Sequence, residues 1–120
     1  MIEKVNLKDA FEKISEAWKP RIAGSVNDSH VKLAKLDGAF MWHHHAEEDE
    51  FFLVVKGRLT LRFRDGDLTL EEGEFAIVPR GVEHLPVAEE ECCVLLVEPA
   101  GTLNTGNLQN ERTVEEPEAL

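Results

Sequence analysis

The first 20 residues carry a helical pattern of apolar and polar positions. Between residues 5 and 18, apolar side chains recur every three or four positions with charged residues between them: Leu7, Phe11, Ile14 and Trp18. This periodicity predicts an amphipathic helix, which Asn6 can cap and which Pro20 ends. Because one helix cannot form a core by itself, we expect the segment 1–20 to pack on another layer.

After Pro20 the pattern changes to short runs that alternate or are continuously apolar, which is typical of strands. Seven strands are predicted, over residues 31–36, 39–45, 51–55, 59–63, 68–70, 75–78 and 93–97. Turn residues such as Asp37–Gly38 separate them at intervals of about ten residues. This spacing predicts an all-β domain over residues 21–100, with antiparallel strands in a sandwich or barrel.

The clearest hairpin spans residues 59–70. Apolar residues alternate with polar ones along its first strand, and Asp65–Gly66 tolerates the positive φ angles of a tight turn. The alternation places Arg62 and Arg64 on the face that points to water.

The run Phe51–Val55 is apolar at both parities, so both faces of this strand must be covered. One face belongs in the core. The other face requires the N-terminal helix, a second subunit, or both. At this chain length we favour a homodimer.

Length and charge exclude several classes of protein. A chain of 120 residues favours one domain. With 13 Lys and Arg against 24 Asp and Glu, its net charge of −11 disfavours nucleic acid and anionic membranes as partners. No apolar stretch approaches the roughly 18 residues of a membrane span, and no secretory signal opens the chain, so we expect a cytoplasmic protein. Residues 101–120 become polar and then acidic, which predicts a partly disordered C-terminal tail.

The histidine-rich segment before Phe51 carries the candidate chemistry. On a strand, His43 and His45 project to the same side about 6.6 Å apart, while His44 faces away. Both imidazoles could therefore reach one ion. Glu50 lies an odd number of residues beyond His45, so a turn must intervene for its carboxylate to face the same interior. The acidic stretch 47–49 is the expected place for that turn.

A fourth candidate ligand is His84, which follows a corner containing Pro79 and Gly81 and could return beside the first two histidines. Three imidazoles and one carboxylate form a mixed nitrogen and oxygen site for one divalent transition metal per chain. Iron, manganese, nickel, copper and zinc all accept this donor set. Four protein ligands leave one or two positions for water or a small molecule.

The spacing of these residues resembles the two motifs of the cupin superfamily. The first motif is matched by His43, His45, Glu50 and Gly57, and the second by Gly73, Pro79, Gly81 and His84. Two departures are present: Gly38 lies one residue too close to the first histidine, and Ala88 stands where the second motif often ends in asparagine. The resemblance implies a double-stranded β-helix, or small jelly roll, that holds one divalent metal near the centre of the barrel.

The resemblance does not select an activity, since cupins include isomerases, dioxygenases, decarboxylases, sugar-binding regulatory domains and storage proteins. Two interpretations stay open: isomerase-like or dioxygenase-like chemistry on a small organic molecule, and a non-catalytic module that binds a small ligand or senses metal. No catalytic residue is assigned. Arg80 could clamp an anionic substrate or could be a solvent-facing turn residue.

Overall fold

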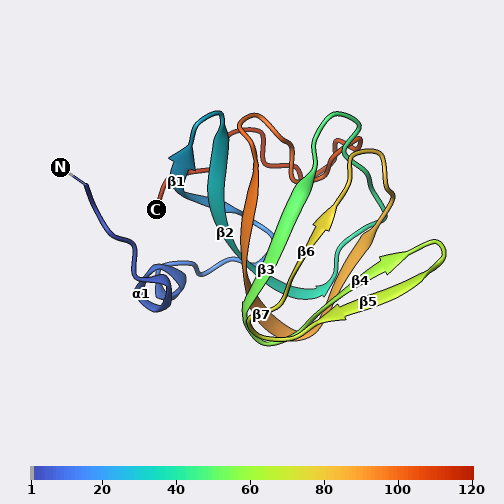
Figure 1. Ribbon diagram of the computed structural model, residues 1–120, viewed down its shortest axis with the longest axis horizontal. Coiled ribbons are helices and arrows are strands. Elements are labelled where there is room, and N and C mark those ends of the chain that lie inside the picture. Colours follow the sequence, from blue (N-terminus) through green and yellow to red (C-terminus); the bar gives the residue numbers. More distant parts are fainter. Residues whose placement is uncertain (1) are drawn as a thin grey trace.

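The computed structural model describes residues 2–120 and shows a curled β-structure with one short helix on its outside (Figure 1). Within these residues the elements, in chain order, are α1 (Leu7–Glu12), β1 (Arg21–Val26), β2 (Ser29–Ala39), β3 (Glu50–Lys56), β4 (Leu59–Phe63), β5 (Gly66–Leu70), β6 (Phe75–Val78) and β7 (Leu85–Pro99). The helix of this described part is too short to span a membrane. The all-β class with one short N-terminal helix is confirmed.

The long strand β7 organises the sheet. Along one edge it pairs with β2, and along the other it pairs first with β4 and then with β3. β1 flanks β2, β6 flanks β3, and β5 closes the hairpin with β4. Every one of these pairs is antiparallel. The sheet therefore curls around an interior, as expected for a jelly roll.

Two apolar clusters stabilise this arrangement. The larger one fills the barrel and includes side chains from β2, β3, β4 and β7. The smaller one lies between the N-terminal segment and the outer face of the sheet, where Phe11 and Ile14 pack with Leu33 and Cys93. Burying a side chain of this size contributes about 1.5–3 kcal/mol. This packing holds α1 on the barrel.

The helix is shorter than the predicted range of 5–18. Asn6 caps it as expected, because its Oδ1 accepts a hydrogen bond from the Asp9 amide at 3.0 Å. Beyond Glu12 the chain leaves the helix and Trp18 adopts a φ of 63°. The Trp18 amide donates to the Lys35 carbonyl at 2.8 Å, and its indole Nε1 donates to the Asp37 carbonyl at 2.8 Å. These contacts with β2 override the helical periodicity.

The strand predicted over residues 39–45 is wrong. β2 continues through Asp37–Gly38, where a register shift against β7 and a φ of 83° at Gly38 mark a bulge and not a turn. Residues 40–45 then run outside the named strands, apart from one bridge between His43 and His84. β1 was not predicted at all, because Gly24 and Ser25 interrupt the apolar residues of the segment Arg21–Val26.

The hairpin of β4 and β5 is confirmed, with its turn one residue earlier than predicted. Phe63 pairs with Gly66, so Arg64 and Asp65 form the two-residue loop. Arg62 and Arg64 are exposed, as their parity predicted.

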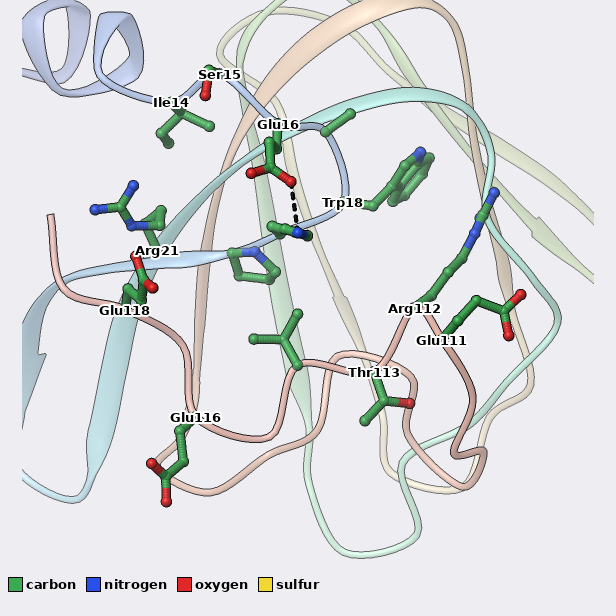
Figure 2. A pocket seen from close by; sticks show the side chains of 14 residues that line it. Ile14, Ser15, Glu16, Trp18, Arg21, Glu111, Arg112, Thr113, Glu116 and Glu118 are labelled. Carbon is green, nitrogen blue, oxygen red and sulfur yellow. Dashed lines mark ion pairs between the residues drawn. The ribbon is translucent and has the colours of Figure 1, made fainter.

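The C-terminal segment returns along the N-terminal part of the chain. The Leu120 amide donates to the Ile22 carbonyl at 3.0 Å, and the Ile22 amide donates to the Glu118 carbonyl at 2.9 Å. A cleft of about 490 Å³ lies between residues 14–21 and residues 111–118 (Figure 2). The domain boundaries at residues 20 and 100, and the partial disorder of the tail, stay predictions.

The outer face of β3 is only partly covered. Val55 packs against the α1 cluster. Farther along the strand, the ring of Phe51 stacks on that of Phe75, with centroids 5.0 Å apart. Phe75 and Ile77 lie on β6, which pairs with β3 alone, and their side chains are 59% and 56% exposed. The helix therefore leaves an apolar patch on β6, at the edge of the sheet as the described residues form it. A second subunit could cover this patch, and the homodimer stays a prediction.

We predict that replacing both Phe75 and Ile77 by threonine converts a dimer into a monomer. Contiguous exposed apolar patches mark interaction sites on soluble proteins, and threonine retains β-propensity while removing the apolar contact. Light scattering at micromolar concentration measures the change. Val26→Thr, which alters an equally exposed apolar residue on β1, is the control and should not change the mass. A monomeric wild-type protein would contradict the prediction.

Candidate metal centre

Four buried side chains meet inside the barrel: His43, His45, Glu50 and His84. One potential ligand atom of each lies within 4.8 Å of those of the other three. The first two come from the segment between β2 and β3, Glu50 is the first residue of β3, and His84 directly precedes β7. The structure thus brings together all four of the residues that the spacing of the sequence selected.

The backbone of this site positions the imidazoles. His43 and His84 exchange two backbone hydrogen bonds, of 3.1 and 2.9 Å, which place their ring centroids 4.4 Å apart. The rings of His43 and His45 lie 5.1 Å apart. His44 between them is only half-buried. The side-chain directions therefore follow the predicted alternation, although this segment is not a regular strand.

Hydrogen bonds to nearby carbonyls fix two of the rings. Nδ1 of His43 donates to the Met41 carbonyl at 2.9 Å, and Nδ1 of His84 donates to the Val82 carbonyl at 3.0 Å. A carbonyl can only accept, so Nδ1 carries a proton in both rings, and in the neutral form of each ring Nε2 has the lone pair that a metal would bind. Histidines that bind metals are commonly oriented in this way.

The carboxylate of Glu50 is the electrostatic centre of the cluster. Its Oε1 lies 3.3 Å from Nε2 of His45 and 3.2 Å from Nε2 of His84. Burial opposes ionisation, but these histidines hold the pKa of Glu50 well below its usual range. Burial likewise opposes the charge on His45, yet Glu50 raises the pKa of that imidazole. By contrast, burial and the neighbouring His84 lower the pKa of His43 to about 4.

The residues present fit a divalent transition metal. Both ring nitrogens of His45 are buried, and within the described protein neither has a partner in hydrogen-bonding geometry. Such orphaned nitrogens are uncommon in protein interiors. Three imidazoles and one carboxylate are a donor set that zinc, iron, manganese, nickel and copper accept. A metal would bind one of the two ring nitrogens of His45 that lack a partner among the described residues.

A small cavity of about 40 Å³ adjoins the site next to His43 and Glu50. Most of its wall is apolar, with side chains from Trp18, Pro20, Ala34, Leu36, Phe40, Phe52, Pro86 and Leu96. Glu98 and Asn104 complete the wall. The amide of Asn104 is already bonded to the backbone of Arg112 and Val114.

The sequence interpretation missed a buried ion pair whose carboxylate, that of Glu98, belongs to this wall. Nζ of Lys32 lies 2.8 Å from Oε1 of Glu98, and both side chains are 2% exposed. Oε2 of Glu98 is buried and has no hydrogen-bond partner among the described residues. Burial and the charge of Glu50 raise the pKa of Glu98, although Lys32 opposes that effect.

Strand parity could have indicated this pair. Lys32 has the parity of Ala34 and Leu36, and Glu98 has that of Val94 and Leu96, all of which are buried in the barrel. Opposite charges at inward positions of two strands that pair with each other are a usable signal.

Arg80 lies outside the cluster. Its Nε is 3.3 Å from Oδ1 of Asp49, and its amide donates to the same oxygen at 2.9 Å. Both side chains are more than half exposed. This exposure favours the interpretation of Arg80 as a solvent-facing turn residue over its interpretation as a clamp for an anionic substrate.

Comparison with known proteins supports the motif assignment. The Cupin_2 family model, described as a cupin domain, matches residues 29–98. A crystal structure of a cupin-2 domain-containing protein from Shewanella frigidimarina NCIMB 400 is 44% identical, with a TM-score of 0.78 over 79% of this chain and 93% of that chain. The structure of protein NMB1881 from Neisseria meningitidis is 36% identical, with a TM-score of 0.75 over 82% of this chain and 100% of that one.

A curated relative from Bacillus subtilis (strain 168), the uncharacterized protein YdbB, is 32% identical over 85 residues. The match covers 70% of this chain and 75% of YdbB. The structure of KdgF from Halomonas sp. is 23% identical with a TM-score of 0.60, a likeness that concerns the fold alone.

We predict that Lys32→Met lowers the free energy of unfolding by about 3 kcal/mol, because it leaves the buried Glu98 without its cation. Urea unfolding measures the change, and the double variant Lys32→Met/Glu98→Leu should regain most of the loss. Lys35→Met on the same strand is the control, because Lys35 lies 3.9 Å from a half-exposed Glu91 and should cost less than about 1 kcal/mol. Equal losses in Lys32→Met and Lys35→Met would contradict the prediction.

Proposed function

The chain belongs to the cupin-domain family, and from this premise we propose that it binds one divalent transition-metal ion per chain through His43, His45, Glu50 and His84. The observation that carries the proposal is the buried cluster itself, whose four donors lie within 4.8 Å of one another. Two of its imidazoles are held by their own backbone neighbours. Four protein ligands leave one or two coordination positions open.

A molecule that reaches the ion would lie in the cavity beside His43 and Glu50, whose volume of about 40 Å³ admits a ligand of only a few atoms unless side chains of its wall move. When bound, the ion would supply Lewis-acid or redox chemistry at an oxygen of that molecule, as isomerase-like or dioxygenase-like reactions require. The rings of Trp18, Phe40 and Phe52 contribute to the apolar wall of this cavity. Oε2 of Glu98 has no hydrogen-bond partner among the described residues, so it is the atom of this wall that would accept a hydrogen bond from a hydroxyl or another donor of such a molecule.

The cavity wall also supports a second candidate, a non-catalytic module for a small ligand or for metal. Apart from the four proposed ligands, the only polar side chains among the described residues of the wall are Glu98 and Asn104. An acid and a base that could work as a separate pair are therefore not apparent from this wall. Turnover of a bound compound would support the metal-dependent enzyme, and binding without turnover would support the non-catalytic binding module. A small-molecule partner and a cytoplasmic location stay predictions from the sequence.

We predict that protein prepared without an affinity tag binds one equivalent of cobalt(II) or zinc per chain. Loss of a residue that only hydrogen-bonds to a metal ligand weakens metal affinity by roughly 10–100-fold. His45→Ala removes a direct ligand and should therefore weaken this binding by more than that. His44→Ala is the matched control and should change affinity less than about threefold, because its ring is not in the cluster. Equal losses in the two variants would contradict the assignment.

The same titration, run by calorimetry at pH 7.5 and pH 6.0, should give weaker binding at the lower pH. Glu50 raises the pKa of His45 above the ordinary value of about 6.5, so a proton occupies this imidazole at pH 6 and the metal must displace it. His43, with a pKa of about 4, stays neutral at both pH values and adds no competing proton. Affinity that does not change with pH would contradict this account of the site.

A further inference from the structure

The segment that carries His43 and His45 lies outside the sheet ladder. Its one bridge joins His43 to His84, so the backbone groups of His44 have no strand partner. Backbone N–H and C=O groups in folded proteins nearly always find partners, and an unpaired segment would hold its side chains loosely. His43 bonds to His84 through both of its backbone groups, and the His45 carbonyl accepts from the Gly81 amide at 2.8 Å, so the contacts of His44 decide how the backbone between these two anchored ligands is held.

Asn107 of the C-terminal segment binds both backbone groups of His44. The His44 amide donates to Oδ1 of Asn107 at 2.9 Å, and the Asn107 amide donates to the His44 carbonyl at 2.9 Å. This reciprocal pair replaces the two bonds that a neighbouring strand would have supplied. Because His44 lies between His43 and His45, the pair acts on the backbone between the two imidazoles.

Gly106 brings the C-terminal segment into direct contact with the ligand segment. Its φ is 60°, and a Cβ at this position would lie 2.2 Å from the His44 carbonyl oxygen and 3.1 Å from Cδ2 of His43. No side chain fits in that space. The close approach places protein backbone against the ring of His43.

The C-terminal segment is itself well anchored. Thr105 is fully buried, and its hydroxyl donates to the Leu108 carbonyl at 2.6 Å. Farther along, Nη1 of Arg112 donates to the Ala39 carbonyl at 3.2 Å, just before the ligand segment. The guanidinium carbon of Arg112 also lies 6.0 Å from the ring centroid of Trp18, alongside which it extends (Figure 2).

We propose that residues 104–114 form a brace for the metal centre and that Asn107 is its positioning residue. The proposal rests on the proposed metal-binding function and adds a part of the chain that the family model, which ends at residue 98, does not reach. The brace acts through the backbone of His44, so that His43 and His45 keep the spacing that one ion requires. Asn107 does not itself contact the metal.

The test compares cobalt(II) binding by wild-type protein with binding by three single variants. Asn107→Leu keeps the size of the side chain but removes the acceptor for the His44 amide. Asn107→Asp restores that acceptor. Gln109→Leu makes the same amide-to-leucine change two residues away, where the side chain contacts Glu115 and not the ligand segment. Affinity is measured by competition with a chelator, and site geometry by the visible absorption of bound cobalt.

We expect Asn107→Leu to weaken cobalt binding by about 10- to 100-fold and to change the absorption spectrum, as the loss of other outer partners of metal ligands does. Asn107→Asp and Gln109→Leu should stay within about threefold of the wild type and keep its spectrum. If Asn107→Leu binds cobalt with wild-type affinity and spectrum, the brace is wrong while the metal site stands. If wild-type protein binds no cobalt, the proposed function and the brace both fail.

Circular dichroism of the metal-free proteins separates positioning from folding. The brace predicts that Asn107→Leu keeps the wild-type strand signal while its cobalt affinity falls. A loss of affinity that accompanies loss of strand signal in Asn107→Leu, and also in the milder Asn107→Ala, would show a purely structural role and would overturn the proposal.

Discussion

Three imidazoles and a carboxylate share the interior of an otherwise apolar barrel, and the rest of the structure depends on how the cost of burying them is offset. Removing such groups from water is unfavourable unless they are paired or coordinate a metal. The protein offsets part of this cost with hydrogen bonds from His43 and His84 to nearby carbonyls, and with the contacts of Glu50 to two histidines. The proposed ion would offset a further part by binding one of the two ring nitrogens of His45 that lack a partner among the described residues.

A buried ion pair, Lys32 with Glu98, lies beside this centre. Lys32 and Glu98 join β2 to β7 across the cavity wall, and Glu98 also interacts with Glu50. Glu98 of this pair lines the cavity and is the acidic side chain there besides Glu50. The wall of the cavity beside the site thus combines the carboxylate of Glu98 with the aromatic rings of Trp18, Phe40 and Phe52.

Local patterns were sufficient to predict the candidate ligands and most strands. Alternation along Leu59–Phe63 and the turn before Glu50 follow from neighbouring residues, so the sequence predicts them. Contacts between residues far apart in the chain could not be predicted from local patterns. Lys32 contacts Glu98, and His44 contacts Asn107, only after β2 pairs with β7 and the C-terminal segment returns. The early end of the helix has a cause of the same kind, because Trp18 donates to the carbonyls of Lys35 and Asp37 only once β2 has formed.

X-ray absorption of the zinc-loaded protein tests the central claim most directly, because it reports the atoms that surround the ion. The account predicts a first shell of imidazole nitrogens and carboxylate oxygen at about 2.0–2.2 Å, with the scattering pattern of several imidazoles. A sulfur shell at about 2.3 Å would contradict it, since that would assign the ion to Cys92 or Cys93. Burial raises the pKa of Cys92 to about 12, which opposes thiolate binding there. A shell without imidazole would contradict the account equally.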